Sequence, residues 1–323
     1  MTSVAIQGHG VAARCCAFLL QRAGIVVSPE EHHPRGPVPA LVISQATQRL
    51  MTGVFEQPGL FAGLSQIEQR VVLWGANSAP VTLPHSAAVI SEETLAARLP
   101  VPAPTVAACD WTIFASGAGP AARHQFGHRH ASVFPAEIQS SEAACWVESL
   151  SEGWLFLIPG WLIAVGADPP ALLNQSRLVA ARIHSLGDPA GSFLACPRIA
   201  DPLCAPAWLA CGSSAMAFDP ICGDGAGNAV REAILAAAII RAAARGEPAE
   251  ALLAHYRARL IAAFQKHLLL CLDFYRAANS GPWWESQISA LECGLTWCAG
   301  HLAAAPPFQY RLQGFELLPV SAS

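Results

Sequence analysis

The sequence predicts an α/β protein with a Rossmann-like domain, a smaller sheet-based region and a helical C-terminal part. Three observations predict this class. The chain begins with a strand, a glycine-bearing turn, a helix and a second strand, the order of a parallel βαβ unit. Short apolar or alternating runs typical of strands follow through the middle of the chain. From residue 226 to residue 276 the pattern is almost continuously helical.

The composition narrows the class of protein further. Apolar residues make up 53% of the 323 residues and charged residues 13%, enough for the core of about two domains. No uninterrupted apolar run reaches the roughly 18 residues of a membrane span, so no transmembrane helix is expected. The net charge is −4 and no block of basic residues occurs, so the chain lacks the basic surface that nucleic-acid-binding proteins use. The eleven cysteines are scattered without a CxxC pair, which indicates buried free thiols and no metal site.

The N-terminal turn has the spacing of a dinucleotide fingerprint. A strand over residues 3–7 is followed by the turn, a helix over residues 14–23 and a strand over residues 25–27. Gly8 would make the tight turn, Gly10 would let a pyrophosphate approach, and Ala13 would keep the helix close to the strand. Glu31 lies where a carboxylate would accept hydrogen bonds from a ribose. The candidate binding segment is Gly8, Gly10, Val11, Ala12, Ala13 and Glu31. A tight packing turn without a ligand is the alternative.

In the middle of the chain, hydrophobic periodicity and residues that break helices and strands predict the secondary structure. We expect helices over residues 40–55, over residues 92–100 with Ser91 as the N-cap, and over residues 172–185. We expect strands over residues 66–75, 79–90, 110–117, 126–136, 143–147, 153–165 and 208–211. The run 153–165 divides into two strands at Pro159 and Gly160. A long helix is expected over residues 248–276, and the tail beyond residue 281 has no assigned structure.

A second glycine-rich turn lies at residues 218–234, where a turn at Asp219 and Pro220 leads into a helix. Glycines allow a ligand to approach the backbone, and a helix that begins there directs free N–H groups at it. This construction suits an electron-rich group. The candidate residues are Asp219, Pro220, Gly223, Gly225, Ala226 and Gly227, with Gly212 and Ser213 at the preceding strand end. A glycine-rich helix start without any ligand is the alternative.

These pieces, taken in order, resemble the FAD-dependent (group A-type) monooxygenase and halogenase-like flavoprotein superfamily over about residues 3–245. The short length and the run GDGAGNAVREAI are similar to the small flavoproteins that mature tryptophylquinone cofactors in partner proteins. The resemblance implies an FAD-binding domain at residues 1–65, 91–125 and 197–245. It implies a substrate region at residues 66–90 and 126–196, and a helical part at residues 246–323.

The resemblance implies that the first turn binds the FAD pyrophosphate and that residues 220–227 lie along the isoalloxazine ring. Ser116 and Ser213 stand where the superfamily usually has aspartates, so the sequence leaves open whether FAD is held tightly, is held weakly or exchanges easily. Halogenases of the superfamily use a lysine from the N-terminal half. The sole lysine here is Lys266, so halogenation is not expected.

The function that the resemblance implies is that of an FAD-dependent oxidoreductase, a monooxygenase that uses O2 and a flavin C4a-(hydro)peroxide on a small aromatic substrate. A cytoplasmic location is expected separately, because the N-terminus lacks the pattern of a signal peptide and the scattered cysteines indicate a reducing compartment. One alternative is a maturase acting on a tryptophan of a partner protein. Another is a degenerate flavin- or nucleotide-binding interaction protein, and a third, an NAD(P)-dependent reductase, leaves residues 218–234 unexplained. No catalytic acid or base is assigned. His9, His128, His130 and His184 are candidates by residue type only, and a structural or exposed role is favoured for each.

Overall fold

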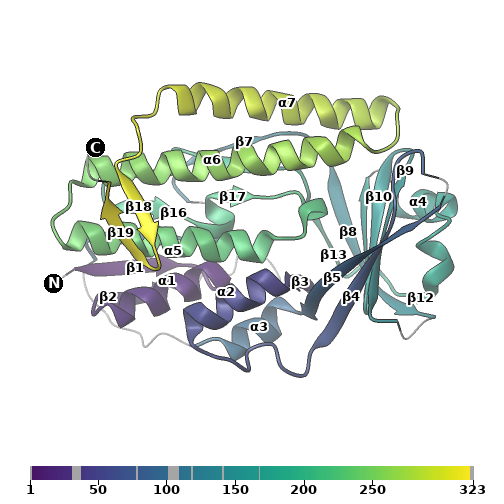
Figure 1. Cartoon of the computed structure of the whole chain (residues 1–323), viewed down its shortest axis with the longest axis horizontal. Coiled ribbons are helices and arrows are strands. Elements are labelled where there is room, and N and C mark those ends of the chain that lie inside the picture. The colour runs from purple at the N-terminus through teal and green to yellow at the C-terminus, as the bar shows by residue number, and fades with distance from the viewer. Residues whose placement is uncertain are drawn as a thin grey trace.

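The computed structural model describes residues 2–30, 38–77, 79–100, 109–117, 119–139, 142–166 and 168–320. It confirms the α/β class. A mostly parallel sheet with its helices occupies one end of the molecule, and a larger, mostly antiparallel sheet occupies the other. Two long C-terminal helices, α6 (Ala249–Arg276) and α7 (Pro282–Ala303), run between the two ends (Figure 1).

The parallel sheet contains the predicted strand, turn, helix and strand. Its order is β15 (Cys204–Ala205), β16 (Trp208–Ala210), β6 (Trp111–Phe114), β1 (Ser3–Gln7) and β2 (Val26–Glu30). Strand β1 pairs in parallel with both β2 and β6, and β16 pairs in parallel with β6. Helix α1 (Val11–Arg22) connects β1 to β2. The carboxyl ends of β1, β6 and β16 therefore meet at one edge of the sheet.

The second sheet has nine strands and supplies the sheet-based region. Its members are β12 (Ile183–Leu186), β8 (His130–Ile138), β11 (Trp161–Gly166), β10 (Gly153–Ile158), β9 (Ala144–Leu150), β4 (Ser65–Leu73), β5 (Val81–Ile90), β3 (Leu41–Ser44) and β13 (Gly191–Leu194). The predicted division at Pro159 and Gly160 is confirmed, because β10 and β11 form an antiparallel hairpin there. The φ of +82° at Gly160 suits a residue without Cβ.

Two of the predicted helices are partly wrong. Residues 41–44 form β3, which pairs with β5, and only then does α2 (Gln45–Phe55) begin, with Ser44 as its N-cap. Helix α4 (Pro169–Gln175) ends before residue 177. The buried carboxylate of Glu148 on β9 accepts the backbone N–H groups of residues 177, 178 and 179. Those N–H groups are thereby withdrawn from a helix, and the chain turns through η1 (Ala180–Arg182) into β12.

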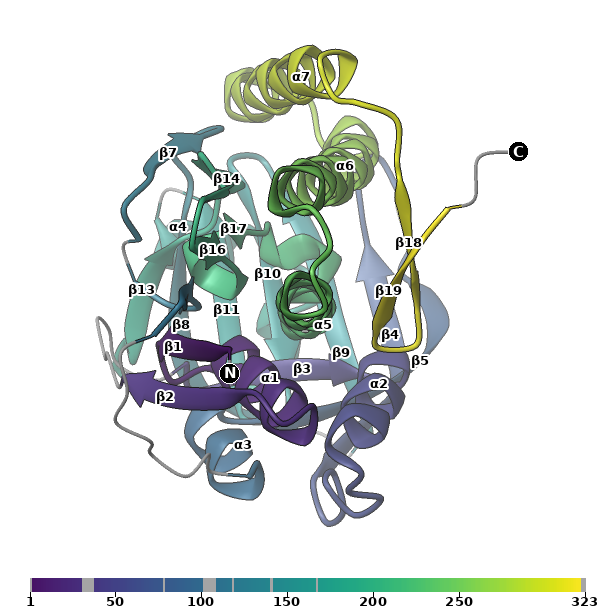
Figure 2. The ribbon, with the colours of Figure 1, turned by 90° about the vertical axis from the view of Figure 1, so that its left-hand side faces the viewer.

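The remaining elements complete the groove described below. They are α3 (Glu92–Arg98) and a three-stranded sheet of β7 (Ala122–Gln125), β14 (Arg198–Asp201) and β17 (Met216–Ala217). The short helices η2 (Gly212–Ser214) and η3 (Pro220–Cys222) precede α5 (Gly225–Ala244). Figure 2 shows α5, α6 and α7 as successive layers. The hairpin of β18 (Tyr310–Gln313) and β19 (Glu316–Pro319) lies beside α5, where Arg241 and Arg245 pair with Glu316.

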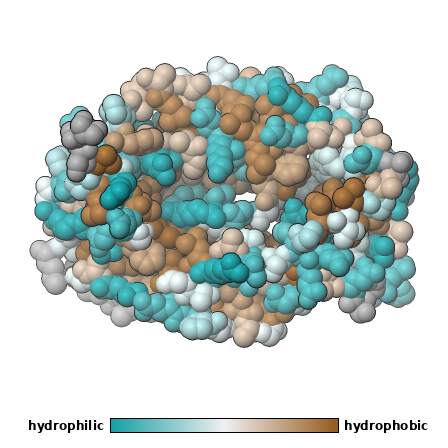
Figure 3. Space-filling view, viewed as in Figure 1, coloured by the Kyte–Doolittle hydropathy of each residue, from teal (hydrophilic) through white to brown (hydrophobic). Residues whose placement is uncertain are grey.

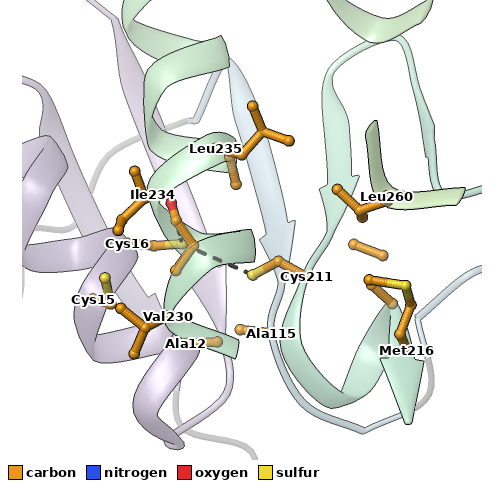
Figure 4. Close-up of a cluster of buried hydrophobic side chains, with 14 of the residues drawn as sticks. Ala12, Cys15, Cys16, Ala115, Cys211, Met216, Val230, Ile234, Leu235 and Leu260 are labelled. Atoms are coloured by element: carbon orange, nitrogen blue, oxygen red, sulfur yellow. Dashed lines mark hydrogen bonds between the residues drawn. The ribbon is translucent and has the colours of Figure 1, made fainter. Parts of the chain in front are cut away.

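The main core lies where α1, α5 and the strand ends meet. Figure 4 shows Cys16 and Cys211 in contact there, with Ala12 and Ala115 beside α5. The outer face is mixed, and brown atoms over α6 and α7 lie among hydrophilic ones (Figure 3). In the part of the chain that the structure describes, no helix is long and apolar enough to cross a membrane.

Candidate active site

A groove with a volume of about 560 Å³ runs along the carboxyl edge of the parallel sheet. It is lined by the turn after β1, by the ends of β6 and β16, and by the start of α5. The lining residues from these segments are His9, Gly10, Val11, Ala12, Ser116, Gly117, Gly212, Ser213, Gly225 and Ala226. Ligands of open α/β sheets bind in the crevice at this edge. Residues from three distant parts of the sequence therefore share one cavity.

Two glycines bring these strand ends close enough to form the groove. Gly8 has a φ of +134°, and a Cβ there would lie 2.5 Å from the Oγ of Ser116. Gly212 has a φ of +55°, and a Cβ there would lie 2.7 Å from the Cβ of Ala12. Both residues shape the groove through backbone packing. Gly10 differs, because its Cβ position meets nothing closer than Glu92 Oε1 at 3.6 Å.

The starts of α1 and α5 line the groove, and the first backbone N–H groups of a helix have no partner within the helix. Neither Gly10, the N-cap of α1, nor Asp224, the N-cap of α5, makes a side-chain capping hydrogen bond. The carboxylate of Asp224 instead accepts hydrogen bonds from Thr47 Oγ1 and Arg231, each at 2.7 Å. Apart from its chain neighbours and the backbone of its own helix, a Cβ at Gly225 would meet no described atom within 4 Å, so this position is open to a ligand. Uncapped helix starts of this kind suit phosphate or other anionic groups.

Charged and polar side chains complete the groove wall. Arg123 on β7 and Arg198 on β14 line it, and the buried Oγ of Ser116 has no hydrogen-bond partner among the described residues. Glu232 is 5% exposed and has no hydrogen bond of good geometry, although the Gly212 amide is near enough to favour its charged form. Burial raises the pKa of Glu232 well above its ordinary value. Cationic groups, free N–H groups and an unsatisfied hydroxyl together fit the pyrophosphate and hydroxyls of a dinucleotide.

A second pocket, of about 250 Å³, lies at the turn Pro220–Cys222 and has an aromatic, apolar lining. Trp74, Trp154, Phe156 and Phe274 line it together with Pro220, Ile221 and Gly223. This pocket and the groove are thus lined by neighbouring residues of one short loop, 220–226. A flat ligand in the groove and an aromatic ligand in the pocket would share that loop.

Among the described residues that line the second pocket, Arg70 is the one charged side chain. One of its guanidinium nitrogens lies 3.2 Å from Nε2 of His85, and the guanidinium lies 5.9 Å from the ring centre of Phe156. Burial, and then the charge of Arg70, lower the pKa of His85 to about 4. The imidazole is therefore neutral near pH 7 and accepts from Arg70. No carboxylate pairs with Arg70 within the described ranges.

Asp219 lines neither cavity and instead anchors the turn from behind. Its side chain is fully buried and pairs with the buried Arg129, while Tyr275 donates to Asp219 Oδ2 at 2.9 Å. The second carboxylate oxygen accepts the backbone N–H of Ile221 at 3.0 Å. Burial acts to lower the pKa of Arg129, and Asp219 and Tyr275 raise it above its ordinary value. The charged pair therefore fixes the start of the loop between the two cavities.

The residues singled out from sequence fall into four groups. Those that line the groove are Gly10, Val11, Ala12, Gly212, Ser213, Gly225 and Ala226. Those that line the second pocket are Pro220 and Gly223. Those that line neither cavity are Gly8, Ala13, Asp219 and Gly227. Glu31 lies outside the described residues; the exposed Glu30, at the end of β2, accepts a hydrogen bond from Gln7 at 2.8 Å.

Several residues that line the two cavities were not among those predicted from the sequence. Arg123, Arg198 and Arg70 come from strands remote from the glycine turns, and no local pattern marks them. All four candidate histidines lie in the described ranges, and of these only His9 lines either of the two cavities. Lys266 is exposed on α6 and lines neither cavity.

Comparisons with solved structures confirm the resemblance at the level of the fold. The flavin-dependent halogenase CmlS superposes with a TM-score of 0.74 at 17% identity, over 92% of this chain and 70% of its own. The peptidyl tryptophan dihydroxylase QhpG, essential for tryptophylquinone cofactor biogenesis, gives 0.72 at 19% identity, over 88% of this chain and 78% of its own. The myxobacterial chondrochloren halogenase CndH gives 0.70 at 15% identity, over 96% and 93%. No protein-family model and no curated protein matches the chain.

Proposed function

We propose that this protein is an FAD-dependent oxidoreductase of the monooxygenase type that acts on an aromatic group. The observation that carries the proposal is the juxtaposition of two cavities at one loop. The long groove fits a dinucleotide, and the aromatic pocket fits a planar substrate. The fold shared with flavin-dependent halogenases and hydroxylases supports the same assignment.

The groove residues would hold FAD along its length. The N–H groups at the start of α1, with Arg123 and Arg198 on the facing wall, would bind the pyrophosphate. The carboxylate of Glu30 at the end of β2, or that of Glu31, the next residue in the sequence, would accept ribose hydroxyls. The start of α5 at Gly225 would stabilise negative charge on the ring. When bound and reduced, the flavin supplies the activation of O2 for oxygen transfer.

The second pocket would orient the substrate and exclude water from it. Its volume of about 250 Å³ is below the roughly 300–1,000 Å³ of pockets for drug-sized ligands, so one ring or a fused pair of rings fits. Trp74, Trp154 and Phe156 offer ring faces and edges for stacking. Arg70, which has no carboxylate partner among the described residues, offers a cation to an acidic or electron-rich substituent. The exposed Lys266 argues against a lysine-dependent halogenation.

The visible absorption spectrum of the purified protein tests the proposal. We expect a two-band flavin spectrum that persists through gel filtration after incubation with FAD. A protein that gains no flavin absorbance at saturating FAD would refute the assignment. A protein that binds FAD but consumes no O2 with any reductant would instead be the non-catalytic binder.

A second candidate substrate is a tryptophan side chain of a partner protein. The observation that favours it is the fold shared with the peptidyl tryptophan dihydroxylase, together with a pocket of suitable size for an indole. Incubation of the FAD-loaded protein with tryptophan-containing peptides and with free indoles separates the two substrate classes by mass. A gain of about 16 or 32 Da only on peptides favours this candidate, and a gain only on free indoles excludes it.

The division into an FAD-binding domain, a substrate region and a helical part, with the boundaries expected from sequence, remains part of this proposal. So does a reducing, cytoplasmic setting, which the absence of disulfides among the eleven described cysteines supports.

A further inference from the structure

A cluster of two thiols and an imidazole lies directly behind the loop that separates the two cavities. The Sγ atoms of Cys222 and Cys271 are 3.5 Å apart, and Cys271 Sγ is 3.3 Å from His267 Nε2. Cys222 ends the turn Pro220–Cys222, while His267 and Cys271 lie one helical turn apart on α6. All three atoms lie within 4.8 Å of one another.

The cluster has the spacing of a metal site, but its imidazole is already engaged. The backbone N–H of Asp219 donates to His267 Nε2 at 2.9 Å. A ring nitrogen has one lone pair, so a nitrogen that accepts this hydrogen bond has none left for an ion. The two sulfur atoms lie next to each other, so a reaction between the two thiols is the chemistry that this geometry allows.

The two cysteines differ in the way that a reactive pair requires. Cys222 is partly exposed, whereas Cys271 is fully buried. A hydrogen bond from the thiol of Cys271 lowers the pKa of Cys222 to about 6, against the effect of burial. Burial raises the pKa of Cys271. Cys222 is thus a thiolate near pH 7 and the accessible nucleophile, and Cys271 is positioned to react with it.

We propose that Cys222 and Cys271 form an oxidisable dithiol whose reactant is a small hydroperoxide. The Cys222 thiolate attacks one oxygen of the peroxide, the S–O bond forms as the O–O bond breaks, and the released hydroxide or alkoxide takes a proton from solvent to give water or alcohol. The sulfur of Cys271 then displaces the hydroxyl of the Cys222 sulfenic acid, forming the S–S bond. The thiol proton and the leaving hydroxide combine to give water. The peroxide is reduced by two electrons, and the dithiol is oxidised by two.

The disulfide would join the two walls of the aromatic pocket. Ile221, beside Cys222, lines that pocket, and so do Phe274 and Ala277, less than two helical turns beyond Cys271. Oxidation would therefore hold the turn against α6 and restrict the pocket. The thiol chemistry itself does not require the proposed flavin, so it stands or falls separately from the proposed function.

Peroxide titration of the reduced protein, followed by alkylation and non-reducing peptide mass spectrometry, tests the dithiol. We expect a linked pair of peptides containing Cys222 and Cys271, a loss of about 2 Da, and full reversal by dithiothreitol. The fully buried pair Cys16 and Cys211, at 3.8 Å, is an internal control that should stay reduced. Oxidation only at other cysteines, with Cys222 and Cys271 both still open to alkylation, would overturn the proposal.

Two variants and a metal measurement complete the test. Cys271→Ser should retain a dimedone-reactive sulfenic acid at Cys222, and the exposed Cys293→Ser should still form the linked pair. In wild-type protein the alkylation rate of Cys222 should rise with a midpoint near pH 6. One equivalent of zinc in the purified protein, with both thiols protected until a chelator removes it, would show a metal site and contradict the dithiol.

Discussion

Replacing Gly225 by valine tests whether the start of α5 faces the flavin. A Cβ at Gly225 would meet no protein atom within 4 Å, and the residue lines the groove. The branched side chain therefore projects into the space for the ligand without displacing the protein. Forcing extra carbons into a filled site costs about 1–3 kcal/mol. That corresponds to roughly a 5- to 150-fold weaker FAD affinity at about 1.4 kcal/mol per tenfold.

The assay is an FAD titration followed by flavin absorbance or fluorescence, with thermal unfolding of the apoprotein measured in parallel. Gly53→Val on α2 is the matched control, because Gly53 is exposed, also has nothing within 4 Å of a Cβ, and lines neither cavity. We expect Gly225→Val to weaken FAD binding while the control does not. Equal FAD affinities in wild type and Gly225→Val would show that this backbone does not contact the flavin.

Three further predictions concern the loop and the cavities. Asp219→Asn leaves Arg129 as an uncompensated buried cation and should lower the free energy of unfolding by about 3–5 kcal/mol, measured by urea unfolding against the exposed Asp273→Asn; a change no larger than that of the control would contradict the anchoring role. The pKa of Glu232 is raised in the folded state, so its contribution to stability is fully present below the ordinary pKa of 4.5 and is lost as pH rises through the folded-state pKa. The free energy of unfolding of Glu232→Gln should therefore increase relative to that of wild type between pH 5 and pH 8. A difference that stays constant with pH would argue against a buried neutral carboxyl. Arg70→Gln should still bind FAD, but its binding of an aromatic carboxylic acid should weaken by about 1.5–3 kcal/mol, and its binding of the neutral analogue by less. Equal losses of affinity for the two ligands would show that the pocket does not recognise the charge.

The sequence determined the parts of this protein that depend on neighbouring residues. The turn from Gly8 to Ala13 and the hairpin at Gly160 follow from backbone freedom and periodicity within a few residues. The N-cap at Ser91 is local in the same way, and its hydroxyl accepts the N–H of Thr94 at 3.0 Å. These interactions span at most four or five positions, so the residue pattern alone specifies them.

The tertiary structure decided what depends on segments far apart in the chain. Glu148 accepts hydrogen bonds from backbone N–H groups about 30 residues away and so prevents α4 from continuing. The sequence of residues 172–185 contains no signal for this interaction. Asp219 faces Arg129 across 90 residues, so it anchors the loop instead of lining a cavity. Cys222 and Cys271 are 49 residues apart and form a reactive pair only because α6 packs behind the turn. Burial and proximity set the chemistry of these groups, and both are properties of the packed chain.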